Sequence, residues 1–183
     1  MELKLKSISQ AGITAAIAKA ERYRYLNEPE EAESICRDIL AVEPAHQLAQ
    51  RILGLTITDQ FVGDVKDRFS EAATIFHDLE QEYERFYYTG ILHERHAKAQ
   101  LTIGRPHQAV IAELEEAMRC FEKAEHIRAK GNDESILRWN RCARLLETIP
   151  HPVMHEEHIA FESADVPPHA ATRGHATRVG RGR

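Results

Sequence analysis

Two histidines are the most prominent candidates for chemistry in this sequence. His93 and His96 stand three residues apart, so on a helix they share one face and could supply two ligands to a metal ion. Glu94 lies between them, but the run His-Glu-Arg-His lacks the spacing of the zinc-protease helix, and no further ligand is evident. The alternative is a packing or surface role, which we expect for this pair.

A second set of candidate ligands lies close to the C-terminus: His151, Met154, His155 and His158. These side chains could chelate a transition metal loosely. Closing a mobile segment around the metal would cost chain entropy. We therefore expect no resident metal and no cofactor.

Motifs of the common enzyme classes are missing from the sequence. It contains no phosphate-binding loop, no GxSxG elbow and no paired-carboxylate motif. Cys36, Cys120 and Cys142 form no CxxC pair and fall on apolar helical faces, which is typical of buried thiols in a reducing compartment. We expect a protein that is not an enzyme.

The charge balance bears on the class of partner. Residues 1–150 hold 20 Lys and Arg against 25 Asp and Glu, and the whole chain has a net charge of −5. Nucleic-acid binding needs a basic surface, so we expect none. The first ten residues lack the apolar core of a signal peptide, and no run approaches the roughly 20 apolar residues of a membrane span. We expect a cytoplasmic protein that binds no membrane.

Helical periodicity extends from about Ile8 to Ile149, without the alternation that strands require, and predicts an all-α fold. The expected helices cover 10–26, 30–42, 45–58, 66–80, 84–103, 106–129 and about 133–148, with a turn at Gly63-Asp64. After Pro150 the apolar periodicity ends. The remaining residues include five His and four Arg, so the sequence predicts a helical domain over 1–150 and a flexible tail over 151–183.

Small and large residues recur at a fixed spacing along the helical part. Ala20 and Gly54 lie 34 residues apart, and Tyr23 and Ile57 follow each of them by three. This is the period of the tetratricopeptide repeat, whose family the chain resembles. Degenerate copies of the repeat signature are carried by Ala20, Tyr23, Ala32, Cys36 and Pro44; by Leu53, Gly54, Ile57, Ala72 and Phe76; by His93, His96, Ala97, Gln100, Ala117, Phe121 and Ala124; and by Trp139, Cys142, Ala143 and Leu146.

The resemblance implies an α-solenoid of antiparallel helix pairs, with about three tetratricopeptide-like repeats and a C-terminal capping helix. The segments at Tyr87–Ile91 and Gly131–Asn140 are also similar to uncharacterised bacterial proteins of this family. Such solenoids bind other proteins on a concave face. Counting from the small residues of the first helices, that face would comprise Glu21, Arg24, Arg51, Leu55, Thr58, Glu94, Lys98, Asn140 and Arg144.

Two functions follow as hypotheses. The first is a scaffold or adaptor that holds a protein or peptide partner in the concave groove. Its excess of cations would favour a partner with acidic groups, unless these are ordinary solvated helix charges. Exposed apolar surface on the end helices would allow a homodimer. The second is a metal- or small-ligand-responsive regulatory protein that uses His93, His96 and the tail histidines.

One aromatic cluster is open to two interpretations. Tyr83, Phe86, Tyr87 and Tyr88 follow one another at helical spacing. Tyrosines anchor many protein interfaces, so the cluster could be a recognition surface. Packing between the fourth and fifth helices is the more common role of aromatic residues at this spacing, and we expect it here.

Overall fold

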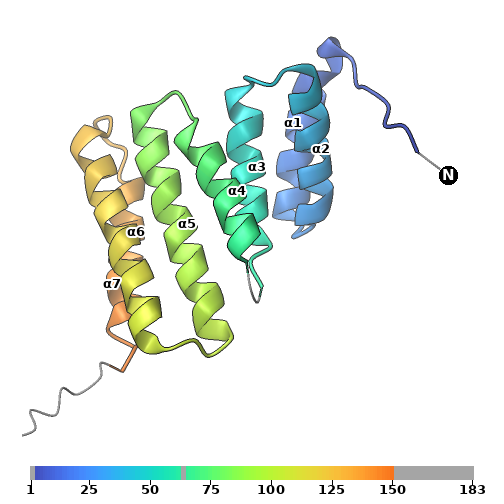
Figure 1. The fold of residues 1–183 in the computed structure, drawn as a ribbon. Coiled ribbons are helices and arrows are strands. Elements are labelled where there is room, and N and C mark those ends of the chain that lie inside the picture. Colours follow the sequence, from blue (N-terminus) through green and yellow to red (C-terminus); the bar gives the residue numbers. More distant parts are fainter. Residues whose placement is uncertain (1–2, 63–64, 151–183) are drawn as a thin grey trace, which may run out of the picture. The chain divides into compact units, whose positions relative to one another are not determined.

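The computed structural model describes residues 3–62 and 65–150, and in these residues every regular element is a helix. The predicted all-α fold is confirmed for this part of the chain. The predicted turn at Gly63-Asp64 and the predicted tail 151–183 lie outside the described residues. After a short 3₁₀ turn, η1 (Gln10–Gly12), come α1 (Ile13–Tyr25), α2 (Pro29–Val42), α3 (Gln47–Asp59), α4 (Lys66–His77), α5 (Glu82–Thr102), α6 (His107–Ile127) and α7 (Glu134–Leu146) (Figure 1).

Local sequence signals account for several helix ends. Pro29 occupies the first turn of α2, where its missing N–H is not needed, and Glu30 and Glu31 complement the helix dipole there. Asn27, between α1 and α2, has a φ of 60°. Gly104 follows α5 with a φ of 70°, which glycine adopts without steric cost.

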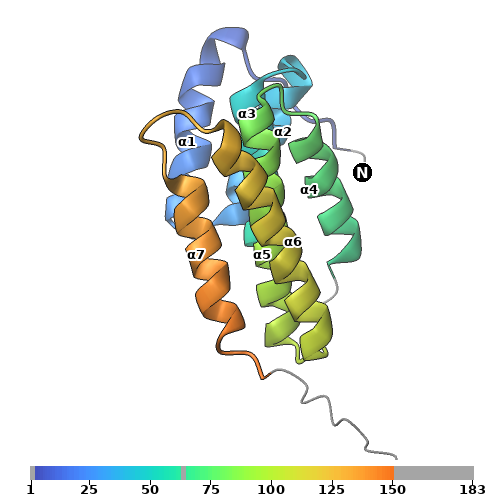
Figure 2. The same cartoon turned by 90° about the vertical axis from the view of Figure 1, so that its left-hand side faces the viewer.

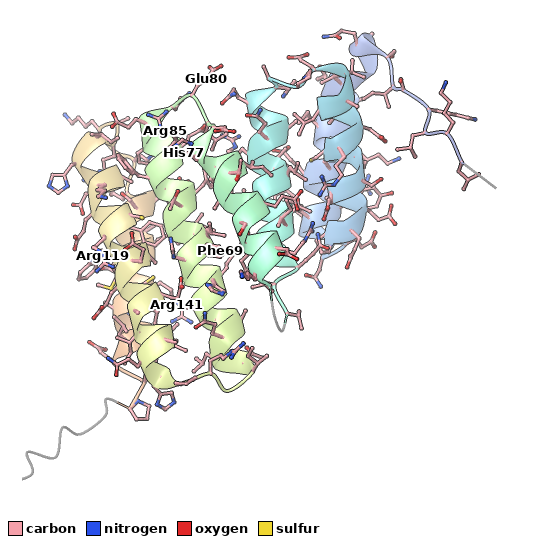
Figure 3. The ribbon with its side chains drawn as sticks, viewed as in Figure 1. Phe69, His77, Glu80, Arg85, Arg119 and Arg141 are labelled. Atoms are coloured by element: carbon pink, nitrogen blue, oxygen red, sulfur yellow. The ribbon has the colours of Figure 1, made fainter. Side chains whose placement is uncertain are left out.

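Most predicted helix boundaries differ from the structure by one to three residues. The fourth helix was expected to reach Glu80, but α4 ends at His77, and Leu79 is buried beyond the helix end. Arg85 holds this connection, because its Nη1 donates to the carbonyl oxygens of Leu79 and Glu80 at 2.8 Å each (Figure 3). The helix expected over 106–129 is shorter at both ends, since α6 covers His107–Ile127.

The helices pack in two layers. Each helix contacts the next one along the chain, and α1 also contacts α3, α3 contacts α5, and α5 contacts α7. We call α1, α3, α5 and α7 the inner layer, and α2, α4 and α6 the outer layer. Figure 2 shows α1 and α7, of the inner layer, on the left, and α4, of the outer layer, on the right.

Two glycines let phenylalanine rings of the outer layer pack close to helices of the inner layer. A Cβ atom on Gly54 of α3 would lie 2.4 Å from Cε1 of Phe76 on α4. A Cβ atom on Gly90 of α5 would lie 2.5 Å from Cε1 of Phe121 on α6. Both phenylalanines are fully buried, so each aromatic ring fills the space that the missing side chain leaves.

The second of these contacts corrects a sequence prediction. The small residue of the third repeat was expected at Ala97, but the structure places the close approach at Gly90. Ala97 is fully buried as well. Seven residues are close to two helical turns, so Gly90 and Ala97 share one face of α5, and the sequence alone could not separate them.

Candidate functional site

A groove of about 470 Å³ opens on the inner layer. It receives side chains from α1, α3, the start of α5 and the start of α7, together with the loop before α7. The lining residues are Glu21, Arg24, Arg51, Ile52, Leu55, Gln81, Tyr83, Glu84, Tyr88, Asn132 and Glu134. We call this the inner groove.

Aromatic packing fixes the α5 wall of the inner groove. Tyr88 stacks on Phe76 with ring centroids 5.5 Å apart, and Tyr83 stacks on Tyr87 at 5.7 Å. Burial raises the pKa of Tyr88 to about 12, against the lowering effect of Arg51. Both groove tyrosines, Tyr83 and Tyr88, are held by packing, so they present fixed aromatic surfaces to the groove.

The two arginines of the inner groove are bound to carboxylates of the same chain. Arg51 Nη1 lies 2.7 Å from Glu84 Oε1, and Arg24 Nε lies 2.8 Å from Asp59 Oδ2. Asp59 also pairs with Arg95 of α5, at 2.7 Å. These bonds link α1 to α3 and α3 to α5, so the two arginines brace the walls of the groove.

Two acidic residues of the inner groove lack such a partner. Within residues 3–62 and 65–150, neither Glu21 of α1 nor Glu134 of α7 forms an ion pair. Glu134 lies close enough to the tyrosines for its charge to raise the pKa of Tyr83, a smaller effect than burial. The groove lining therefore holds three carboxylates against two guanidinium groups.

The structure brings together only part of the predicted concave face. Glu21, Arg24, Arg51 and Leu55 all line the inner groove. Thr58 and Glu94 are buried, and Glu94 binds Lys98 and Arg138 within the chain. Lys98 is half-exposed beside Glu94, Arg144 is exposed on α7, and Asn140 lines a separate hollow between α6 and α7 with Trp139.

Intramolecular pairing changes the electrostatic interpretation of this face. The predicted concave face carries four cations, Arg24, Arg51, Lys98 and Arg144. The structure pairs the first three with carboxylates of the chain itself, whereas Arg144 forms no ion pair within residues 3–62 and 65–150. Each paired charge is partly neutralised, so the count of cations from sequence overstates the attraction of this face for acidic groups.

The predicted histidine pair lies away from the inner groove. His93 and His96 of α5 sit between Phe69 of α4 and Glu113 of α6; Figure 3 shows the place of Phe69 on α4 beside α5. His93 Nδ1 lies 2.7 Å from one oxygen of Glu113, and His96 Nδ1 lies 3.2 Å from the other. Burial raises the pKa of Glu113, but its contacts with the two histidines outweigh this effect and hold the pKa at about 2.

His93 and His96 pack against Phe69 and Glu113 of the neighbouring helices. Within the described ranges, no group of three or more His, Cys, Asp or Glu side chains is placed to hold a metal ion. The predicted ligands of the tail lie outside these ranges.

The surroundings of the three cysteines indicate a structural role. Cys36, Cys120 and Cys142 are free and buried. Burial raises the pKa of the Cys36 thiol to about 12 and that of Cys120 to about 11. These thiols carry little thiolate at neutral pH, so they are poor nucleophiles. None of the described helices combines the length and apolar character that a membrane crossing requires.

Sequence reasoning missed several residues of the inner groove, above all Glu84 and Glu134. A signal for Glu84 was present, because it follows Arg51 by 33 residues, close to one repeat period. Tyr83 and Tyr88 were noted only as members of an aromatic cluster. In the structure Tyr88 packs against Phe76 of α4 and Tyr87 against Phe121 of α6, while Tyr83 and Tyr88 also line the groove.

Comparisons of the chain with protein-family models, with curated proteins and with solved structures find no match.

Proposed function

We propose that this chain is a non-catalytic, cytoplasmic scaffold or adaptor, built as a tetratricopeptide-like α-solenoid, and that it binds a segment of a partner protein in the inner groove. The observation that carries the proposal is the groove itself. It crosses the inner layer, with lining residues from α1, α3, α5 and α7. A surface formed by several repeats is suited to an extended partner that touches each of them.

Contacts one repeat period apart support the repeat architecture. Arg51 bonds to Glu84 across 33 residues, and Arg24 bonds to Asp59 across 35. In the outer layer, Arg37 bonds to Glu71 across 34 residues. Equivalent positions of adjacent repeats are neighbours in a solenoid, so bonds at this separation are what stacked repeats of about 34 residues would produce.

The chemical character of the inner groove suits a peptide segment. Leu55 and the rings of Tyr83 and Tyr88 offer apolar contact, while Gln81 and Asn132 offer amide groups for hydrogen bonds. Tyrosines held in place by packing lose little conformational entropy on binding, which favours them as anchors.

A peptide selection tests this proposal. A random library of 12-residue peptides is selected on the full chain, and the binders are measured against variants by fluorescence anisotropy. Leu55→Gln is expected to weaken binding about tenfold, because it replaces an apolar contact inside the groove with an amide. Circular dichroism establishes that the variant keeps its helical fold.

The matched control is Leu137→Gln, which makes the same change on α7 at a leucine that is 66% exposed and outside the groove. It is expected to bind the peptides as the original chain does. Equal weakening by both variants, or none by Leu55→Gln, would show that the peptides bind elsewhere and would reject the inner groove as the binding surface.

A further inference from the structure

We infer that the inner groove binds a basic segment of the partner, with a lysine or arginine side chain held between its carboxylates and its tyrosines. This inference rests on the proposed function and names the chemistry of the partner. It reverses the charge that the sequence alone favoured for that partner.

The charge of the groove lining is the first argument. Glu21, Glu84 and Glu134 face Arg24 and Arg51, which leaves one negative charge in excess. Arg24 also pairs with Asp59, which lies outside the lining and binds Arg95 as well. A cation entering the groove would therefore meet a surplus of carboxylate.

The positions of the two unpaired carboxylates are the second argument. Glu21 comes from α1 and Glu134 from α7, the first and last helices of the inner layer. Both line the same groove and neither has an ion-pair partner within the described part of the chain. Glu21 also attracts Arg51 and raises its pKa, a smaller effect than burial, which lowers it. A cationic side chain in the groove would gain attraction from these carboxylates without breaking the Arg51–Glu84 pair.

The aromatic wall is the third argument. Ring faces attract cations through their quadrupole, and they do so more strongly when the site is partly shielded from water. Tyr83 and Tyr88 both contribute to the lining. Phe76 covers one face of Tyr88 and Tyr87 covers one face of Tyr83, so a cation would meet the opposite face of each ring. Aromatic ring faces beside carboxylates attract an ammonium or guanidinium group, whereas the same faces do not attract a carboxylate group.

Three further cations of the inner layer are absent from the groove lining. Arg95 binds Asp59, and Lys98 and Arg138 both bind Glu94. Each of these cations is thus paired with a carboxylate of the chain itself. A bound segment would contact the acidic groove through its own basic residue.

The test uses peptides selected on the full chain from the random 12-residue library. The tightest groove binder is synthesised in three forms that differ at one position: with its basic residue, with glutamine and with glutamate. The basic form is expected to bind at least about fivefold more tightly than the glutamine form, and the glutamate form more weakly still. Raising the salt concentration is expected to narrow these differences.

The double variant Glu21→Gln, Glu134→Gln is expected to lose most of the preference for the basic form. Its matched control is Glu31→Gln, Glu115→Gln, which makes the same net change at exposed positions of α2 and α6 and is expected to keep the preference. Both variants alter exposed or half-buried carboxylates, so both are expected to fold.

The outcomes separate this inference from the proposed function. Peptides that lose affinity in Leu55→Gln, yet bind equally well in all three forms or favour glutamate, would overturn the inference and leave the scaffold function standing. An unchanged preference in the double variant would also overturn it. Peptides that bind equally well to Leu55→Gln would reject the groove and the inference together.

Discussion

Replacing Gly54 with leucine is expected to lower the free energy of unfolding by about 3 kcal/mol, because the new side chain would occupy the space of the Phe76 ring. A Cβ atom alone would lie 2.4 Å from Phe76, and the ring is fully buried and cannot move aside into solvent. Urea denaturation followed by circular dichroism at 222 nm measures the change. An unchanged midpoint would show that α3 and α4 do not meet at Gly54.

Two variants identify the cause of this destabilisation. Ala15→Leu adds a similar volume at an exposed position of α1 and is expected to leave stability nearly unchanged. Phe76→Ala is expected to cost about 3 to 5 kcal/mol by itself, because it leaves a cavity. Combined with Gly54→Leu it should cost less than the sum of the two, since the leucine fills the space that the ring vacates. Additive effects would indicate that the residues do not touch.

The sequence placed both members of this contact at signature positions, although it did not predict that they touch. Gly54 lies one period after Ala20, and Phe76 occupies the large position of the same repeat. In the third repeat, α5 extends for 21 residues, whereas α3 has 13. A helix longer by two turns offers two small residues on the same face, Gly90 and Ala97, and only packing against Phe121 distinguishes them.

The residues of the inner groove could also be predicted only in part, and the reason differs from that for the third repeat. Counting from a small residue assigns a side chain to a face of its helix, and four predicted residues do line the groove. This counting does not reveal which charged side chains form ion pairs with each other. Arg51 was correctly placed, yet its availability depends on Glu84, which belongs to the next repeat. Pairing between repeats therefore decides the charge of the surface.

Lowering the pH from 5 to 2 is expected to remove several kcal/mol of stability, because two carboxylates have a strongly depressed pKa in the folded chain. Burial raises the pKa of Glu33, but hydrogen bonds from Arg68, Arg37 and Gln60 outweigh it and lower the pKa from 4.5 to about 2. Glu113, bound by His93 and His96, also has a pKa of about 2.

The sign follows from the direction of these pKa shifts. A carboxylate whose folded pKa lies below its unfolded value stabilises the fold fully above about pH 4.5, and this contribution disappears as the pH falls towards 2. Each shift corresponds to about 3 kcal/mol. The side chains of Glu33 and Glu113 are 14% and 23% exposed, so solvent screens these interactions only in part.

Glutamine substitutions test the assignment to these two residues. Glu33→Gln and Glu113→Gln are each expected to be less stable than the original chain at pH 7, and to lose less stability between pH 4.5 and pH 2. Glu115→Gln, at an exposed position of α6 two residues from Glu113, is the control and should retain the pH dependence of the original chain.

Urea denaturation at a series of pH values gives the free energy of unfolding for each chain. If the stability of Glu113→Gln fell as steeply between pH 4.5 and pH 2 as that of the original chain, the contact of Glu113 with the two histidines would not stabilise the fold. The number of protons taken up on unfolding would then be the same with and without Glu113.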